Sequence, residues 1–155
     1  MNNIVKIDEK LNKIIEVILV ILTIIMVVAM SSNIFLRYVV HRSPIWASEL
    51  TTFLFVWIVF LGVSILSKSE EHVAFEFIFN SRYKSVRTFA KISMRLVTLI
   101  IAYLFITQGS KLAVMSMKQV SLDMRFPMGI VYLVIPICGV LMGIHILANF
   151  IRDYT

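Results

Sequence analysis

Residues 17–36 read VILVILTIIMVVAMSSNIFL, and this run of 20 residues contains no charged side chain. About 20 consecutive apolar residues are needed for a helix to cross the hydrocarbon core of a bilayer. The apolar residues are continuous and do not alternate with polar ones, which argues against a strand of a membrane barrel. In lipid, a helix is then the structure that satisfies every backbone polar group.

Three further charge-free runs follow along the chain: Leu50–Ser67 with 18 residues, Leu96–Ser110 with 15 and Phe126–Ile151 with 26. The middle one is short, but the aliphatic stem of Lys111 extends it at one end and residues 91–94 at the other. The sequence therefore predicts an all-α integral membrane protein with four transmembrane helices in a single domain. The expected spans are residues 14–37, 44–67, 91–112 and 126–150.

The composition is that of a chain surrounded by lipid. Of the 155 residues, 59% are hydrophobic and 15% are charged, whereas soluble domains have about 25% charged residues. The net charge of +6 is expected to meet anionic lipid headgroups, and no nucleic-acid partner is expected. The single cysteine, Cys138, excludes a disulfide within the chain. The first run is too long for a signal peptide and follows the polar pair Asp8-Glu9, so a retained helix is expected.

The basic residues orient the four spans. An even number of spans places both termini on one side, and cytoplasmic segments carry an excess of Lys and Arg. With the N-terminus in the cytoplasm, ten basic residues lie inside and five outside, which favours an N-in, C-in topology. The inner residues are Lys6, Lys10, Lys13, Lys68, Arg82, Lys84, Arg87, Lys91, Arg95 and Arg152. The outer residues are Arg37, Arg42, Lys111, Lys118 and Arg125.

The loop before the second span predicts where that helix begins. Ser43-Pro44 has the residue types preferred at the N-cap and at the first helical position. Trp46 is then expected at the membrane interface, where tryptophan is enriched. Glu49 is expected near the positive end of the helix dipole, which favours a negative charge.

The connection between the second and third spans is the most polar part of the chain. His72, Glu76 and Asn80 recur every four residues among aromatic and aliphatic residues. This pattern predicts a short amphipathic helix over residues 70–80, lying in the membrane interface. A basic stripe follows, which predicts that the third helix begins before it enters the membrane and contacts anionic lipid. The stripe consists of Lys84, Arg87, Lys91 and Arg95.

No motif for catalysis or metal binding occurs in the sequence, so we expect neither enzyme activity nor a cofactor. His72 and His145 are expected at the same membrane face, where paired histidines can bind haem, but nothing else indicates such a site. Glu16 lies in the first turn of the first span. It leaves open an alternative function, a self-sufficient homodimeric exporter in which Glu16 couples to protons. The nearby Lys13 and a shallow depth favour an interfacial side chain instead.

Small and polar residues within the spans predict contacts between helices or subunits. Asn33 and Gln108 lie near the outer ends of their spans and are candidates for interhelical hydrogen bonds, with solvation at headgroup level as the alternative. Gly139 and Gly143 have GxxxG spacing, which permits close helix packing. Pro136 predicts a kink in the fourth span.

Four short motifs occur in order along the chain. They are NIFLRY at 33–38, SPIWASEL at 43–50 leading into FLFVW at 53–57, EHV at 71–73, and FPMG at 126–129 running on to Tyr132 and Pro136. With four spans and this length, the chain resembles the small membrane subunit of tripartite ATP-independent periplasmic (TRAP) transporters. The resemblance extends over residues 14–150 and covers nearly the whole chain.

The resemblance implies a role in a complex. In that family a periplasmic protein captures a carboxylate solute such as a dicarboxylate or sialic acid, and a large membrane subunit moves it inward with a sodium gradient. The small subunit pairs with the large one, braces its stationary scaffold and presents surface to the solute-binding protein. The implied location is the bacterial inner membrane, and the implied partners are the large subunit, the solute-binding protein and membrane lipids. The chain ends soon after its fourth span, as expected of an unfused small subunit.

The residues of these motifs carry over as candidate partner-contact or structural positions. In the first outer loop they are Arg37, Trp46, Ser48 and Glu49. At the entry to the fourth span they are Phe126, Pro127, Met128 and Tyr132, and the neighbouring Arg125 is expected to contact a partner as well.

Two departures from the family pattern concern charge. The family has a second acidic residue beside the Glu49 position, where this chain has Ser48, and Glu76 stands where the family has an aspartate. Any ionic contact made through these acidic positions is therefore expected to be placed differently in this chain. Arg37 and Glu49 flank one short loop, so we expect them to pair with each other or with a partner's charges, or else to serve as membrane-edge anchors.

Overall fold

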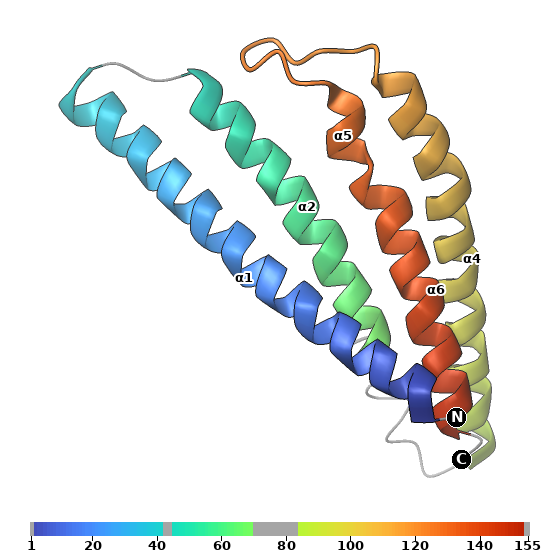
Figure 1. Cartoon of the computed structure of the whole chain (residues 1–155). Helices are drawn as coiled ribbons and strands as arrows, with labels where there is room; N and C mark the ends of the chain where they lie inside the picture. Colours follow the sequence, from blue (N-terminus) through green and yellow to red (C-terminus); the bar gives the residue numbers. More distant parts are fainter. Residues whose placement is uncertain (1, 42–44, 70–83, 154–155) are drawn as a thin grey trace.

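The computed structural model describes residues 2–41, 45–69 and 84–153. Its helices are α1 (Asn2–Val39), α2 (Ile45–Ser69), α4 (Lys84–Ser116), α5 (Met128–Tyr132) and α6 (Val134–Asp153), as labelled in Figure 1. Within these residues, four stretches are long and apolar enough to cross a membrane: Asp8–Val39, Trp46–Ser67, Ile92–Ser116 and Met128–Ile151. The prediction of an all-α protein with four spans is confirmed. The predicted interfacial helix over 70–80 and the predicted helix start at Ser43-Pro44 lie outside the described residues.

Both chain termini lie at one end of the bundle, here called the termini end (Figure 1). The opposite end, here called the loop end, carries the α1–α2 connection and the loop between α4 and α5. Helix α6 packs along α4, and α2 lies between α1 and α6. Helix α1 meets α6 at the termini end and diverges from it toward the loop end. This divergence leaves much of α1 without a neighbour in the chain.

Several hydroxyl groups inside the spans are satisfied by the helices that carry them. Thr23 Oγ1 donates to Leu19 O at 2.7 Å, and Thr98 Oγ1 donates to Met94 O at 2.9 Å. The same bond to the carbonyl four residues earlier is made by Thr51, Thr52, Ser67, Thr107 and Ser110. These bonds let threonine and serine lie in lipid without a partner from another helix.

The fourth span is interrupted where the sequence predicts a kink. Pro136 has no backbone N–H, so the carbonyl of Tyr132 lacks the donor that a regular α-helix would supply four residues later. Helix α5 ends at Tyr132 and α6 begins at Val134, with Leu133 between them in a helical conformation, φ −59° and ψ −24°. Leu133 N still donates to Gly129 O at 3.1 Å, so the two segments continue as one span.

The core lies between α2, α4 and α6. Cys138 is buried on α6 and its thiol donates to the carbonyl of Phe60 on α2 at 3.0 Å. Phe60 in turn meets Phe105 of α4 edge to face, with ring centroids 5.6 Å apart. A second buried cluster joins Ile15 of α1 to Leu61 of α2 and Val134 of α6. The four spans therefore share a continuous apolar interior.

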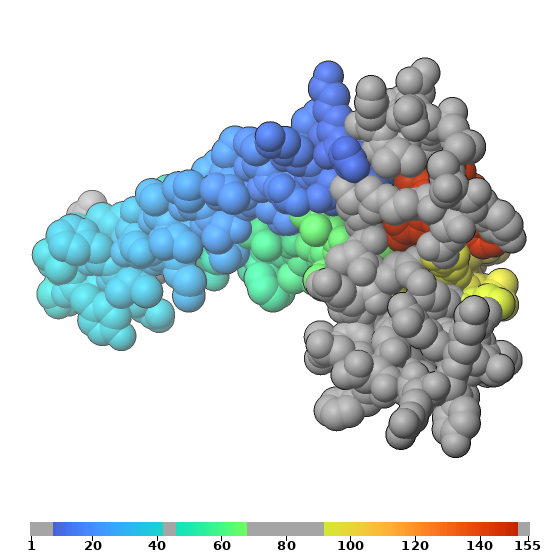
Figure 2. Space-filling model, turned by 90° about the horizontal axis from the view of Figure 1, so that it is seen from below, coloured from blue at the N-terminus to red at the C-terminus, as the bar shows by residue number. Residues whose placement is uncertain are grey.

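Burial differs sharply between the first and last spans. In the most apolar 18-residue stretch of each, 6% of the residues are buried in the first span and 39% in the last. In Figure 2, which views the molecule from the termini end, α1 extends as a long arm with α2 beside it. The exposed apolar side chains of α1 include Val20, Ile24, Val28 and Phe35. This surface needs either lipid or another membrane protein against it.

Candidate functional site

A buried acid–histidine pair joins the first and last helices at the termini end. His145 Nδ1 of α6 lies 2.5 Å from Asp8 Oδ1 of α1, although the two residues are 137 positions apart. The exposed fraction is 0% for His145 and 1% for Asp8. A carboxylate only accepts, so the imidazole donates from Nδ1. The pair thus ties α1 to α6 where these helices converge.

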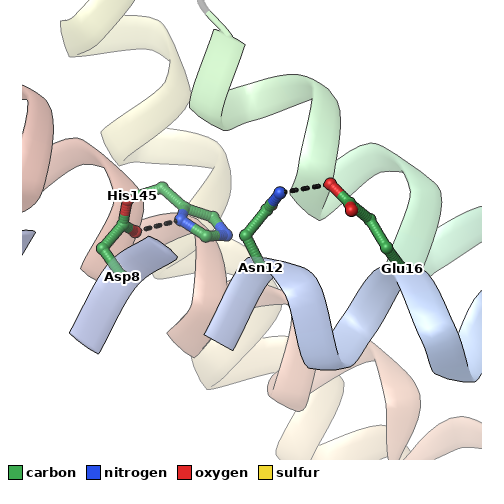
Figure 3. Close-up of polar contacts among 4 residues, drawn as sticks. All are labelled: Asp8, Asn12, Glu16 and His145. Atoms are coloured by element: carbon green, nitrogen blue, oxygen red, sulfur yellow. Dashed lines mark hydrogen bonds and ion pairs between the residues drawn. The ribbon is translucent and has the colours of Figure 1, made fainter. Parts of the chain in front are cut away.

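A second polar pair follows Asp8 on α1. Asn12 Nδ2 donates to Glu16 Oε1 at 2.6 Å, and Asp8, Asn12 and Glu16 follow one another at helical spacing. Figure 3 shows the His145 ring between Asp8 and Asn12, with its second nitrogen on the side of Asn12. Within the part of the chain that the structure describes, His145 Nε2 and Asn12 Oδ1 are buried without a hydrogen-bond partner, as is Ser64 Oγ of α2.

At the loop end, the loop between α4 and α5 is held against α2. Glu49 Oε2 accepts a hydrogen bond from the backbone N–H of Met124 at 2.8 Å. Inside the loop, Ser121 N donates to Phe126 O at 2.9 Å and Phe126 N donates to Ser121 Oγ at 3.1 Å. Arg125 sits in the turn between them with φ +50°, a conformation uncommon for a side chain other than glycine. The loop is therefore shaped by its own bonds and tied to α2 by one carboxylate.

An apolar groove of about 270 Å³ lies below this loop, between α1, α2 and α5. It is lined by Leu22, Leu50, Phe53, Leu54, Trp57, Met124, Phe126, Ile130 and Val131. Four of these residues lie on α2, which supplies the largest share of the lining of the groove. An apolar groove of this kind accepts an apolar side chain or an acyl chain, but it has no groups that would recognise a charged solute.

The two glycines of the predicted GxxxG pair lie in different surroundings. A Cβ on Gly139 would lie 2.9 Å from Ala102 O of α4, so this glycine allows α4 and α6 to approach closely. A Cβ on Gly143 would meet nothing within 4 Å. Sequence reasoning missed two other close contacts, at Gly109, which faces Ile135, and at Gly129, which faces the carbonyl of Ala113. Nothing in their sequence context distinguishes them from an open glycine.

The other predicted contact residues lie mainly on the surface. Arg37, Trp46, Ser48, Gln108 and Arg125 are exposed, and Asn33 is half-buried. Pro127 caps α5 in an extended conformation and pairs with Val120 in an isolated antiparallel bridge. Glu49 contacts Met124, and in the described ranges it forms no ion pair with Arg37.

The predicted lipid-contact set is only partly visible. His72 and Glu76 lie outside the described residues, and of Lys84, Arg87 and Lys91 only the helical backbone is described. The Arg95 guanidinium lies 5.5 Å from the centre of the Phe150 ring of α6, so this side chain packs within the chain. No cluster of three or more His, Cys, Asp or Glu suited to a metal ion occurs among the residues described.

Asp8, Asn12 and Ser64 are polar positions that sequence reasoning missed. Asp8, Asn12 and Glu16 recur every four residues, and that spacing was the available signal for a polar stripe on one helix face. The contact of Asp8 with His145 depends on how α1 and α6 meet. No local pattern carries that information.

A comparison with protein families decides which proteins the chain is related to. The family model described as "Tripartite ATP-independent periplasmic transporters, DctQ component" matches residues 24–155. The chain belongs to this family. The resemblance to the small TRAP membrane subunit is thereby confirmed at the level of the family, and the chain is a multi-pass membrane component of a transporter.

A similar protein points to the same class of transporter. Over 73 residues, or 47% of the chain, it is 34% identical to the sialic acid TRAP transporter permease protein SiaT of Haemophilus influenzae (strain 86-028NP). The matched region covers 12% of that protein, so the chain spans only a small part of this relative's length.

Proposed function

We propose that this chain is the small subunit that pairs with a large permease subunit in sodium-coupled uptake of a carboxylate solute. Membership of the DctQ family carries the proposal. The solute class, dicarboxylate or sialic acid, follows the family resemblance and the name of the Haemophilus relative. The chain acts here as a scaffold and not as an enzyme, in the bacterial inner membrane. A periplasmic solute-binding protein delivers the solute to the assembled transporter.

The nearly uncovered first span supports pairing through α1. Apolar surface alone does not drive helices together in lipid, so association depends on close packing and on polar contacts. Helix α1 offers a long apolar face for close packing, and the apolar groove beside it is open to a partner side chain. The better-buried α4 and α6 already pack against each other.

Co-purification with the large permease subunit tests the pairing. We expect the chain to purify with this subunit in mild detergent, and Val28→Trp on α1 to weaken the complex because a bulkier side chain prevents close packing. Leu99→Trp on α4 is the matched control, since Leu99 is similarly exposed (53% against 59% for Val28) and is expected to leave pairing unchanged. A stable solitary protein that binds no large subunit would contradict the proposed function.

The topology proposed for this function is N-in and C-in, because ten of the fifteen Lys and Arg residues then lie in the cytoplasm. The loop end, with Arg37, Glu49 and Arg125, would face the periplasm. There its charged surface is placed to meet the solute-binding protein, and charge complementarity mainly raises the rate of such encounters.

Charge changes at the loop end test this contact. Arg37→Glu and Arg125→Glu are expected to lower the association rate with the solute-binding protein by on the order of tenfold at low salt. Glu49→Gln removes the charge but keeps an oxygen that accepts from Met124 N. This variant therefore tests the effect of the charge without breaking the bond that holds the loop. Lys10→Glu, exposed at the termini end, is the control. Equal effects of Arg37→Glu and Lys10→Glu in stopped-flow binding and uptake would argue against a periplasmic contact at the loop end.

A further inference from the structure

Glu16 is an exposed carboxylate at the level of the apolar core. The preceding residue, Ile15, is 5% exposed and belongs to the same buried cluster as Leu61 and Val134. Leu61 lies eight residues before the end of α2 at Ser69, about 12 Å at the rise of an α-helix. The side chain of Glu16 therefore projects from α1 at a level well inside the bundle and not at its end. A carboxylate facing lipid at such a depth is costly and usually marks a functional position.

A hydrogen bond from Asn12 holds this carboxylate in place. Asn12 is 9% exposed, and its amide nitrogen donates to Glu16 Oε1 at 2.6 Å. A carboxylate only accepts, so the amide nitrogen of Asn12 is the atom that faces Glu16 and the amide oxygen points elsewhere. Both this oxygen and His145 Nε2 are buried and have no partner among the described residues. Asp8, on the far side of the ring, fixes His145 through Nδ1. Glu16 is thus held by Asn12, and among the described residues no hydrogen bond joins Asn12 to the Asp8–His145 pair.

Nothing described in the chain supplies a cation to Glu16. Lys13 lies one turn earlier on α1 and is exposed, but it forms no ion pair with Glu16 within the described ranges. The guanidinium of Arg95 on α4 lies over the Phe150 ring of α6. The one hydrogen bond from Asn12 leaves most of the acceptor capacity of the carboxylate unused, since an ionised carboxylate has about four acceptor positions.

We propose that Glu16, positioned by Asn12, binds a Lys or Arg side chain from a membrane helix of the large permease subunit. This inference rests on the proposed function and names a specific polar contact within the pairing surface of α1. A cationic side chain fits because the site presents an oriented carboxylate in a medium where a charge is stable only when paired. This ionic contact would fix the register of the otherwise apolar face of α1 against the partner helix.

The test compares Glu16 with a matched acid on the same face. Glu9 lies two turns nearer the N-terminus, at a spacing of seven residues, and is exposed. In complexes purified with the large subunit, Glu16→Gln is expected to weaken pairing by about 30-fold or more, because it leaves the partner's cation unpaired. Glu9→Gln is expected to change pairing less than about twofold, because interactions of exposed charges contribute little. Glutamine keeps the acceptor for Asn12 Nδ2, so the isolated chain should keep its melting temperature.

Charge exchange identifies the partner residue. Glu16→Lys is expected to abolish pairing, and one Lys→Glu or Arg→Glu change in a membrane helix of the large subunit should restore it. Wild-type pairing by Glu16→Gln would overturn the inference while leaving the proposed function intact. Full pairing with loss of proton-dependent transport in liposomes would also overturn it, and would assign the carboxylate to proton binding. If the unaltered chain fails to pair at all, the proposed function fails and the Glu16 contact fails with it.

Discussion

Replacing Asp8 with alanine is expected to destabilise the folded chain by about 1–3 kcal/mol, the range for leaving a buried polar group without its hydrogen-bond partner. The His145 ring has 0% exposure, and Asp8 is its only hydrogen-bond partner among the described residues. Removing the carboxylate leaves both ring nitrogens without a hydrogen-bond partner in a buried site. The free energy of unfolding, measured in mixed micelles with increasing denaturing detergent, gives the size of the effect.

A double variant separates pairing from packing. Asp8→Leu together with His145→Leu replaces both polar groups by apolar ones of similar volume, and such exchanges are often neutral or stabilising. We therefore expect the double variant to recover most of the stability that each single variant loses, with a coupling energy of about 2–3 kcal/mol. Asp123→Ala, in the exposed loop between α4 and α5, is the control and should change stability little. Additive losses in the cycle would show that Asp8 and His145 do not stabilise the fold as a pair.

Gly139→Ala is expected to cost about 1–3 kcal/mol, the usual range for adding a methyl group to a filled interior. The new Cβ would lie 2.9 Å from Ala102 O and 3.0 Å from Ile106 N, and both are backbone atoms of α4. A flexible side chain can turn away from such a contact, but a helix backbone must move as a unit. We expect α4 and α6 to separate slightly, with a lower melting temperature of the isolated chain.

Gly143→Ala is the matched control on the same helix, one turn further along. Its Cβ would have open space, and alanine favours a helix over glycine by about 1 kcal/mol. We expect this variant to be as stable as the unaltered chain or slightly more stable. Gly129→Ala, whose Cβ would approach Ala113 O to 2.5 Å, should resemble Gly139→Ala. Equal melting temperatures for the Gly139 and Gly143 variants would disprove the close approach of α4 and α6.

The two glycines of the GxxxG pair show what a sequence motif can predict and what it cannot. The spacing predicts that one helix face is small, and Gly139 does lie in a close helix contact. It does not say which glycine meets a neighbour, because that depends on the angle at which α6 crosses α4. Gly143 faces open space in the single chain and stays a candidate for contact with a partner subunit.

Arg37 and Glu49 show the same limit of sequence-based prediction for charged residues. Both residues flank one short loop, and closeness in sequence made an ion pair between them a natural expectation. In the structure Glu49 instead holds the N–H of Met124, which lies 75 residues away, and the loop before α5 is brought to α2 by the packing of the fourth span. The charge of Arg37 stays exposed for a contact outside the chain.

The number and positions of the spans, the all-α class and the break near Pro136 followed from the order of residues alone. In lipid each backbone polar group must be satisfied within its own helix, so a span is a property of contiguous residues and can be read locally. The Asp8–His145 pair, the uncovered face of α1 and the role of each glycine required the folded structure. These features depend on how helices distant in sequence rotate and cross, and packing across the whole bundle sets those angles.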